Sequence, residues 1–447
     1  MIPPEDLAGV LILLPAFFIL LGATEAWARI GSPQPETTRK LIHVGGGALC
    51  AVFPFVFHSW PTVLIVTLGL AALLDVGARL RWFRSLNRVE RKSRGSQYFP
   101  LAALFVYFLS GERVWLYVAS ILVLTLADAA AALVGERHGR IRYEVDTDSK
   151  SLEGSLAFFG LAFLAIAIPC ITLADLPLVV SLLAALLVSI LVTGFEAISL
   201  RGSDNLFVPI GVCVILDKIT AQPPEEIVFQ LVSMALIGLS VAWFVRPSRS
   251  FNTGGTIVFA LFMYGAWSLG SPYWALPLFI AFAIHRIFWW IRPLPPVKSA
   301  VVLRALLIPL LALMIANSTR DNVWWFGPYL AAWTTTSSLT LWNHMLQIRL
   351  WKRSSRPVGA GAIAGLVGLT IAGIPWWIGV GIPWRSWIAV GTITLMASLL
   401  HDLFLGPSPR LNGEEAWTPL RLFLTALAAL AYLALQSMRL IAPWPPL

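Results

Sequence analysis

Two neighbouring stretches of the sequence concentrate the residue types that phosphate chemistry requires. The first, TLADAAAALVGERHGR at 125–140, carries Asp128 inside an otherwise apolar run, and the second, DSKSLEGSLAFF at 148–159, carries Lys150 and Glu153. Carboxylate oxygens are ligands that Mg²⁺ accepts, and a lysine can act as a point charge on phosphoryl oxygens. Ionisable groups within apolar helices are costly to insert into a membrane, so each is a candidate for function. Together the two stretches predict a site for phosphoryl chemistry.

Small residues accompany the first of these acids on one helix face. Asp128, Ala131, Ala132, Gly135 and Gly139 recur at spacings of three or four residues, which puts them on the same side of a helix. That face would let a phosphate or a second backbone approach closely. The two glycines taken alone are typical of a packing seam between membrane helices. A packing seam gains nothing from a buried carboxylate, so the aspartate favours the functional interpretation.

The second stretch has the pattern of a helix start. Lys150 and Glu153 are three residues apart, so we expect both on one turn, with Ser149 or Ser151 as the cap. A helix N-terminus attracts phosphate. We therefore predict that Lys150 contacts phosphoryl oxygens, while Glu153 and Asp128 hold Mg²⁺. The alternative is a capped helix with a local Lys–Glu pair and no ligand.

Two further places carry candidate residues. Arg39 and Lys40 would add positive charge for phosphate, and His43 can hydrogen-bond phosphate or act as a base. A single histidine on an apolar helix can equally be a satisfied core residue. Asp204 and Asn205 are typical of a broken helix start, where Asp204 can cap the helix, bind a metal or take a substrate proton. The pattern does not choose among these roles.

The composition of the whole chain determines its class. Of 447 residues, 58% are apolar and 12% are charged, about half the charged share of a soluble domain. This excludes a water-soluble enzyme and indicates an all-α polytopic membrane protein with about 14 to 16 spanning helices. A polar break near 246–253 divides it into a catalytic module, 1–250, and a second module, 251–447. The expected spans are 8–28, 41–58, 60–79, 98–111, 113–134, 155–174, 176–199, 205–218, 226–246, 253–270, 273–291, 298–317, 323–348, 358–375, 386–404 and 419–440.

The distribution of charge predicts the orientation. The loop 79–95 carries seven lysine and arginine residues against the single acid Glu90, so it should be cytoplasmic. Alternation from there puts the candidate residues at cytoplasmic helix ends, where nucleotides are. The net charge of +9 then reflects loop bias, and no nucleic-acid partner is expected. A transporter or a non-catalytic scaffold would account for the helix count equally well, but not for charges gathered at one face.

The motifs, taken together, resemble those of the polyprenol kinases, the group that includes phytol, farnesol and dolichol kinases. The order D-x-x-A-x-x-x-G-x-x-x-G, a spacer, then K-x-x-E-G appears as Asp128, Ala131, Gly135, Gly139, Lys150, Glu153 and Gly154. Three more segments match in the same order, namely ETTRKLIHVGGG at 36–47, RGSQYFPLA at 94–102 and EAISLRGSDNLFVPI at 196–210. The resemblance covers residues 36–210.

This resemblance implies transfer of the γ-phosphoryl group of a nucleoside triphosphate, usually CTP, to the hydroxyl of an isoprenoid alcohol in the bilayer. With the residue-level reasoning, it predicts a catalytic set of His43, Asp128, Lys150, Glu153 and Asp204. The predicted nucleotide-binding set is Arg39, Lys40, Gly135, Gly139, Lys150, Gly154 and Asn205. The alternative within enzymes is a cytidylyltransferase that forms a CDP-lipid, although the K-R…K-D…H-G-G ending shared by those enzymes is absent from the sequence.

The second module has weaker signals. Its opening, NTGGTIVFALFMYGAWSLGSPYWAL from 252, faintly resembles phytyl-phosphate kinases, but the stretch YLAAWTTTSSLTLWNH at 329–344 has no carboxylate where an acidic segment would be expected. We therefore expect either a related module that has lost catalysis or a scaffold that holds lipid.

Overall fold

The computed structural model describes residues 3–31, 35–80, 95–146, 148–199, 202–245, 250–291, 296–347, 356–377, 384–405 and 418–443. These residues form two compact units, Met1–Val232 and Ser233–Leu447. The division lies inside a helix, α12 (Pro224–Val245), whereas the sequence analysis divides the chain after residue 250. The basic residues at 81–94, Arg201 and the polar break at 246–249 lie outside the described residues.

The first unit consists of helices and one small hairpin. Its helical elements are α1 (Pro4–Ile30), α2 (Pro35–Ala51), α3 (Phe53–Val56), α4 (Trp60–Arg79), α6 (Gly95–Ser110), α7 (Val114–Leu122), the π-helix η1 (Val123–Ala127), α8 (Asp128–His138), α9 (Leu152–Thr172), α10 (Leu178–Ile198), α11 (Asp204–Thr220) and the start of α12.

The second unit is helical in its described part. Its elements are α13 (Thr253–Gly265), the π-helix η2 (Ala266–Gly270), α14 (Pro272–Ile291), α15 (Ser299–Thr319), α16 (Asn322–Gln347), α17 (Arg356–Trp377), α18 (Trp384–Leu405) and α19 (Thr418–Ser437).

The helices have the length and composition of membrane spans. Each of the sixteen expected segments coincides with a helical stretch. Ten helices among the described residues are long and apolar enough to cross a bilayer. The chain is therefore an all-helical polytopic membrane protein.

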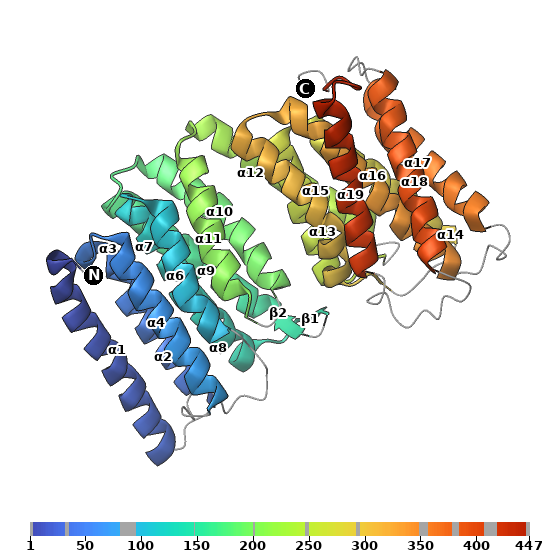
Figure 1. Cartoon of the computed structure of the whole chain (residues 1–447). Helices are drawn as coiled ribbons and strands as arrows, with labels where there is room; N and C mark the ends of the chain where they lie inside the picture. The colour runs from blue at the N-terminus through green and yellow to red at the C-terminus, as the bar shows by residue number, and fades with distance from the viewer. Residues whose placement is uncertain are drawn as a thin grey trace. The chain divides into compact units, whose positions relative to one another are not determined.

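A two-stranded hairpin joins α8 to α9, and the sequence analysis did not predict it. Strands β1 (Arg142–Val145) and β2 (Asp148–Ser151) pair antiparallel, with Val145 opposite Asp148. Asp146 adopts a left-handed conformation, φ 53°, at the turn, which aspartate tolerates better than most residues. The hairpin lies where α8 ends and α9 begins (Figure 1).

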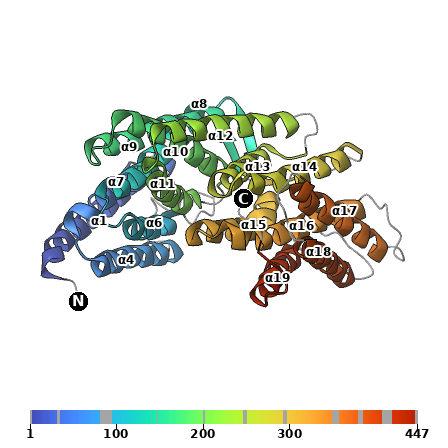
Figure 2. The same cartoon turned by 90° about the horizontal axis from the view of Figure 1, so that it is seen from above.

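Helix packing in the first unit brings distant parts of the sequence together. Helix α8 packs on α9, α9 on α10, and α11 lies between α10 and α6, an order that is visible from above in Figure 2. Helix α2 packs on α1, α7 and η1. A Cβ at Gly47 of α2 would overlap the side chain of Thr125, so glycine is required where α2 meets η1.

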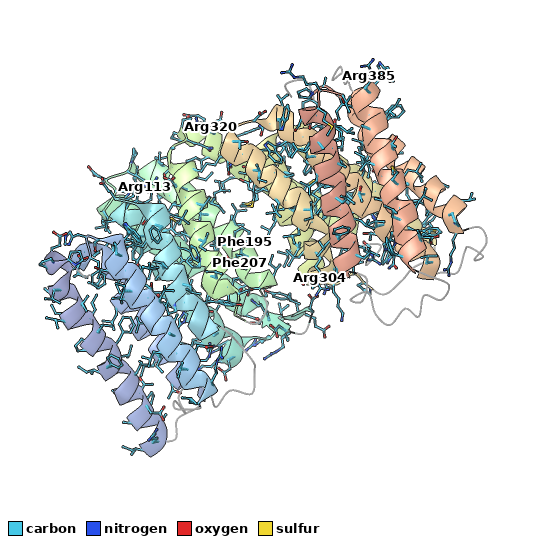
Figure 3. All side chains as sticks on the ribbon, in the orientation of Figure 1. Arg113, Phe195, Phe207, Arg304, Arg320 and Arg385 are labelled. Atoms are coloured by element: carbon cyan, nitrogen blue, oxygen red, sulfur yellow. The ribbon has the colours of Figure 1, made fainter. Side chains whose placement is uncertain are left out.

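Polar contacts join loops and helix ends at the end of the first unit that lies opposite the hairpin. Arg113, just before α7, pairs with Asp217 near the end of α11, and Figure 3 shows Arg113 at that end. Asp6 is fully buried and accepts hydrogen bonds from the backbone nitrogens of His58, at 2.7 Å, and Ser59, at 3.2 Å. These contacts give the polar groups at this end hydrogen-bond partners from loops and helix ends that lie close in space.

Polar side chains in the second unit form a ladder between two helices. Thr334 of α16 bonds Thr394 of α18 at 2.8 Å, and Ser338 bonds Ser398 at 2.9 Å. Small hydroxyl residues of this kind let membrane helices approach and hydrogen-bond to each other. Part of the stretch at 329–344 that lacks carboxylates is thus a helix-packing face.

Candidate active site

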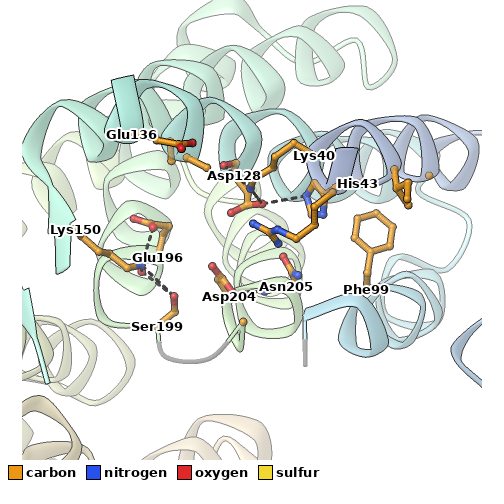
Figure 4. Close-up of a pocket in the computed structure, with 18 of the residues that line it drawn as sticks. Lys40, His43, Phe99, Asp128, Glu136, Lys150, Glu196, Ser199, Asp204 and Asn205 are labelled. Atoms are coloured by element: carbon orange, nitrogen blue, oxygen red, sulfur yellow. Dashed lines mark hydrogen bonds and ion pairs between the residues drawn. The ribbon is translucent and has the colours of Figure 1, made fainter. Parts of the chain in front are cut away.

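One cavity of about 700 Å³ contains most of the predicted site residues, and its lining belongs to the first unit. Its polar end is formed by the start of α2, by α8, by β2, by the end of α10 and by the start of α11 (Figure 4). Its other end is apolar and is formed by α1, α2, α4 and α6. The polar end carries Arg39, Lys40, His43, Asp128, Lys150, Glu196, Asp204 and Asn205.

Asp128 is the centre of the first cluster. Lys40 donates to Asp128 Oδ2 at 2.6 Å and to the Asp128 backbone oxygen at 3.1 Å, and its side chain is almost wholly buried. His43 Nε2 lies 2.9 Å from the backbone oxygen of Leu124 and 3.2 Å from Asp128 Oδ2. Both of these partners are acceptors, so we assign a proton to Nε2. In this arrangement Nε2 donates and cannot serve as a base.

The backbone next to Asp128 explains how His43 reaches it. Leu124 lies in the π-helix η1, which interrupts the helix directly before Asp128. A π-helical turn is wider than an α-turn and often occurs at functional sites. The Leu124 carbonyl of this turn accepts the hydrogen bond from His43, which fixes the ring of His43 beside the carboxylate.

Lys150 belongs to a second cluster. Its ammonium donates to Glu196 Oε1 at 2.6 Å, to the Glu196 backbone oxygen and to Ser199 Oγ at 3.2 Å. Burial by itself would lower the pKa of Lys150, but the carboxylates of Glu196 and then Asp204 outweigh it, so the pKa is raised above its ordinary value. Lys150 is therefore a fixed cation at neutral pH.

The local structure around Lys150 differs from the prediction. Lys150 lies on strand β2, opposite Tyr143, and not on a helix turn shared with Glu153. Ser151 is the N-cap of α9, and its Oγ accepts from the Gly154 nitrogen at 3.1 Å. The expected capped helix start is confirmed. The helix begins after the lysine, because strand β2 continues through residue 151.

The structure does not bring Glu153 to Asp128. The Glu153 carboxylate accepts from the backbone nitrogen of Ile141, at 3.1 and 3.3 Å, and it does not line the cavity. The backbone nitrogen of Leu152 also donates to the Ile141 oxygen at 2.9 Å. Glu153 thus ties the hairpin to the first turn of α9, and we do not carry it forward as a partner of Asp128 in holding Mg²⁺.

Asp204 and Asn205 begin α11 and face the space between the two clusters (Figure 4). The backbone nitrogen of Asn205 donates to Asp204 Oδ1 at 3.1 Å, a bond within the same helix start. The Asp204 carboxylate also interacts electrostatically with Asp128 and Lys150. The broken helix start thus brings one more acid to the centre of the site.

The predicted glycines lie where α8 packs on the start of α9. A Cβ at Gly154 would lie 2.8 Å from the backbone oxygen of Ala131, and one at Gly135 would lie 3.0 Å from Ser151 Oγ. Gly135 and Gly154 line the cavity, whereas Gly139 follows α8 and does not. These contacts let α8 approach the start of α9, which agrees with the packing-seam interpretation for this pair of helices.

The donor set at the polar end suits a magnesium–phosphate complex. Within the described residues, no group of three or more histidine, cysteine and acidic side chains is arranged to hold a metal without other ligands. Mg²⁺ is commonly held by one or two carboxylates with water and substrate phosphates. Asp128 and Asp204 line the same cavity and repel each other, and a divalent cation would offset that repulsion. The residues therefore fit Mg²⁺ through Asp128 and Asp204, together with phosphate oxygens.

Sequence reasoning did not identify the pairing partners or the apolar end of the cavity. The sequence did contain an indication that Glu196 would pair with a lysine or arginine, because an acid at the end of an apolar helix needs a cation. Asp75, in the last turns of α4, pairs instead with Arg79 of its own helix at 2.8 Å. The apolar end has no residue-type signature, since its side chains are ordinary core residues.

Comparisons with known proteins identify the family. No protein-family model and no solved structure matches the chain. The chain is 32% identical to a phytol kinase of Synechocystis sp. over 190 residues, which is 42% of this chain and 81% of that protein. A match that covers most of the relative agrees with the motifs described above. The chain therefore belongs to the phytol kinase family, within the polyprenol kinases.

Proposed function

We propose that this chain transfers the γ-phosphoryl group of a nucleoside triphosphate, CTP by family resemblance, to the hydroxyl of an isoprenoid alcohol. The observation that carries the proposal is one cavity that has two lysine–carboxylate pairs at one end and an uncharged, apolar arm at the other. A prenyl alcohol has the same division, since a single hydroxyl follows a long hydrocarbon chain.

The polar end would bind the phosphates. Lys40 is a buried cation and Lys150 a partly buried one. Their present acceptors are carboxylate and carbonyl oxygens, and phosphoryl oxygens are acceptors of the same kind. Asp128 and Asp204 would hold Mg²⁺, which supplies positive charge against the phosphoryl oxygens. Arg39 and Asn205 line the same end and complete the nucleotide-binding set.

The chemical step requires positioning and one proton transfer. The hydroxyl oxygen of the alcohol forms a bond to the γ-phosphorus, and the bond from that phosphorus to the bridging oxygen breaks. The electron pair of the broken bond leaves with the nucleoside diphosphate. One oxygen of Asp204 would hold Mg²⁺, and we assign the hydroxyl proton to its other oxygen, because the Nε2 atom of His43 already donates and Asp128 is paired with Lys40.

The proposal includes a place in the membrane and a role for the second unit. The polar end would face the cytoplasm, where nucleotides are, as the basic loops predict. Residues 251–447 would hold lipid or act as a scaffold, since the cavity is lined by the first unit.

The direct test supplies membranes containing the protein with labelled CTP or ATP and a panel of phytol, farnesol, geranylgeraniol and a long polyprenol. We expect a prenyl monophosphate that carries the label from the γ position. Asp204→Asn should lower turnover roughly 30-fold to 1000-fold, the usual contribution of one such group. Asp217→Asn is the matched control, the same change near the other end of α11, and it should be nearly neutral because its pair with Arg113 is exposed. A CDP-lipid product, or no product with any alcohol, would contradict the proposal.

A further inference from the structure

The apolar arm of the cavity follows one face of α2. His43, Gly46 and Cys50 line the cavity, and their spacings of three and four residues put them on one side of the helix. At 1.5 Å per residue, His43 and Cys50 are separated by about 10 Å along the axis. The arm therefore extends away from the ion pairs toward Cys50, which is 2% exposed.

Helices α1 and α4 also line the arm with hydrocarbon groups. Helix α1 contributes Phe17 and Leu21, and α4 contributes Leu70 and Leu74. The polar end meets the arm at His43. The ring of His43 packs edge-on against the ring of Phe99, with 5.1 Å between the ring centroids. The arm therefore suits a hydrocarbon chain whose polar head lies at the ion pairs.

Three consecutive glycines of α2 have three different environments. A Cβ at Gly45 would lie 2.8 Å from the Leu20 side chain, and a Cβ at Gly47 would overlap Thr125. A Cβ at Gly46 would meet Phe17 at 3.6 Å, an ordinary contact. Helix packing therefore explains glycine at 47, and at 45 the Leu20 side chain would have to move, whereas at 46 the absent side chain leaves space in the arm.

We infer that the arm holds the hydrocarbon chain of the substrate, and that Gly46 determines which chains fit. This inference rests on the proposed function and adds a specificity-determining residue to it. The occupant is the alcohol's own chain, because the arm is continuous with the polar end where that hydroxyl would react. A side chain larger than alanine at residue 46 would fill the arm beside Phe17.

The test uses the full-length protein with Gly46→Leu and Gly46→Ala. Gly69→Leu is the matched control, since Gly69 of α4 is exposed and has open space around it. For Gly46→Leu we expect KM for branched C15–C20 alcohols to rise roughly 10-fold to 200-fold. The KM for the nucleotide and turnover of a short C5 alcohol should stay near wild type. Gly46→Ala should shift the chain-length preference in the same direction but by a smaller factor. It replaces Gly46→Leu in the test if the leucine variant does not fold.

A binding measurement separates this inference from the proposed function. An isoprenoid alcohol with a photoreactive group on its chain should crosslink to Phe17, Cys50 or Leu70, compete with unlabelled alcohol, and lose these crosslinks in Gly46→Leu. Wild-type protein that crosslinks but forms no phosphate ester would contradict the proposed function alone. An unchanged chain-length preference in both Gly46 variants, or labelling of the arm by a photoreactive phospholipid that alcohol does not displace, would overturn the inference.

Discussion

Lys40 and Lys150 each donate to an acid from another element of the fold, so tertiary contacts fix both lysines of the site. Lys40 meets Asp128 at 2.6 Å, and Lys150 meets Glu196 at 2.6 Å. Removing one member of a buried ion pair leaves the other charge uncompensated, which is more costly than the pair itself is favourable. Substitutions in these pairs must therefore be assessed for stability as well as for turnover.

The residue-scale prediction compares Asp128→Asn with Lys150→Ala. Asp128→Asn should lower turnover roughly 30-fold to 1000-fold and raise the Mg²⁺ concentration required. It should also destabilise the protein by up to about 3–5 kcal/mol, since Lys40 is 4% exposed and would lose its partner. The Lys40→Met/Asp128→Asn double variant should recover stability but not turnover. Kinetics against Mg²⁺ and thermal unfolding check this.

Lys150→Ala should behave differently in the same assays. Nucleotide affinity and turnover should both fall, while the apparent Mg²⁺ affinity should change much less. Because the pKa of Lys150 is raised above its ordinary value, the side chain keeps its charge throughout the neutral and mildly alkaline range. The wild-type rate should then show no step from this group between pH 6 and 9, and full activity of the alanine variant would remove Lys150 from the site.

At the scale of elements, the hairpin between α8 and α9 sets the position of Lys150. Strand β1 is attached to the start of α9 by Tyr143, whose hydroxyl bonds Ser155 Oγ at 2.7 Å, and by Glu153 at the Ile141 nitrogen. Strand β2 then presents Lys150 to the end of α10. We therefore expect Glu153 to act as a positioning residue for the lysine.

The element-scale prediction concerns Glu153 and Tyr143. Glu153→Gln retains an acceptor for Ile141, so turnover and Mg²⁺ dependence should change little. Tyr143→Phe loses one hydrogen bond and should lower turnover roughly 2-fold to 10-fold, and Glu153→Ala should have a similar effect. Trypsin should cleave after Arg142 faster in Tyr143→Phe and in Glu153→Ala than in the wild-type protein. A collapse of turnover in Glu153→Gln that high Mg²⁺ rescues would instead establish Glu153 as a metal ligand.

At the scale of the molecule, the first unit has two chemically different ends. The hairpin end carries the cavity, and the other end carries the Arg113–Asp217 pair (Figure 3). Helix α11 runs from Asp204 at one end to Thr220 at the other. The basic loops predict that the hairpin end is cytoplasmic.

The prediction at this scale is tested with single cysteines at Arg140 and Thr220. The native cysteines at 50, 170 and 213 are buried, so an impermeant maleimide should label the introduced residues selectively. In intact cells we expect labelling at 220, and labelling at 140 only after the membrane is opened. Labelling at 140 from outside intact cells would put the nucleotide site on the wrong face and contradict the orientation.

The sequence by itself determined the class of the protein and the residue types of its site. Long apolar runs require helices in a bilayer, since every backbone polar group must be satisfied internally, and each expected span coincides with a helical stretch. Spacing within a helix also determined that Asp128 shares a face with Gly135. These inferences depend on local geometry, which the order of residues controls directly.

Only the tertiary structure decided which of these residues meet. Asp128 and Lys40 are 88 residues apart, and Lys150 and Glu196 are 46 apart, so helix packing alone makes them partners. It also directs Glu153 toward the hairpin and opens the arm beside Gly46. Periodicity fixes the face of a helix on which a side chain lies, but the neighbour of that face depends on how all the helices pack.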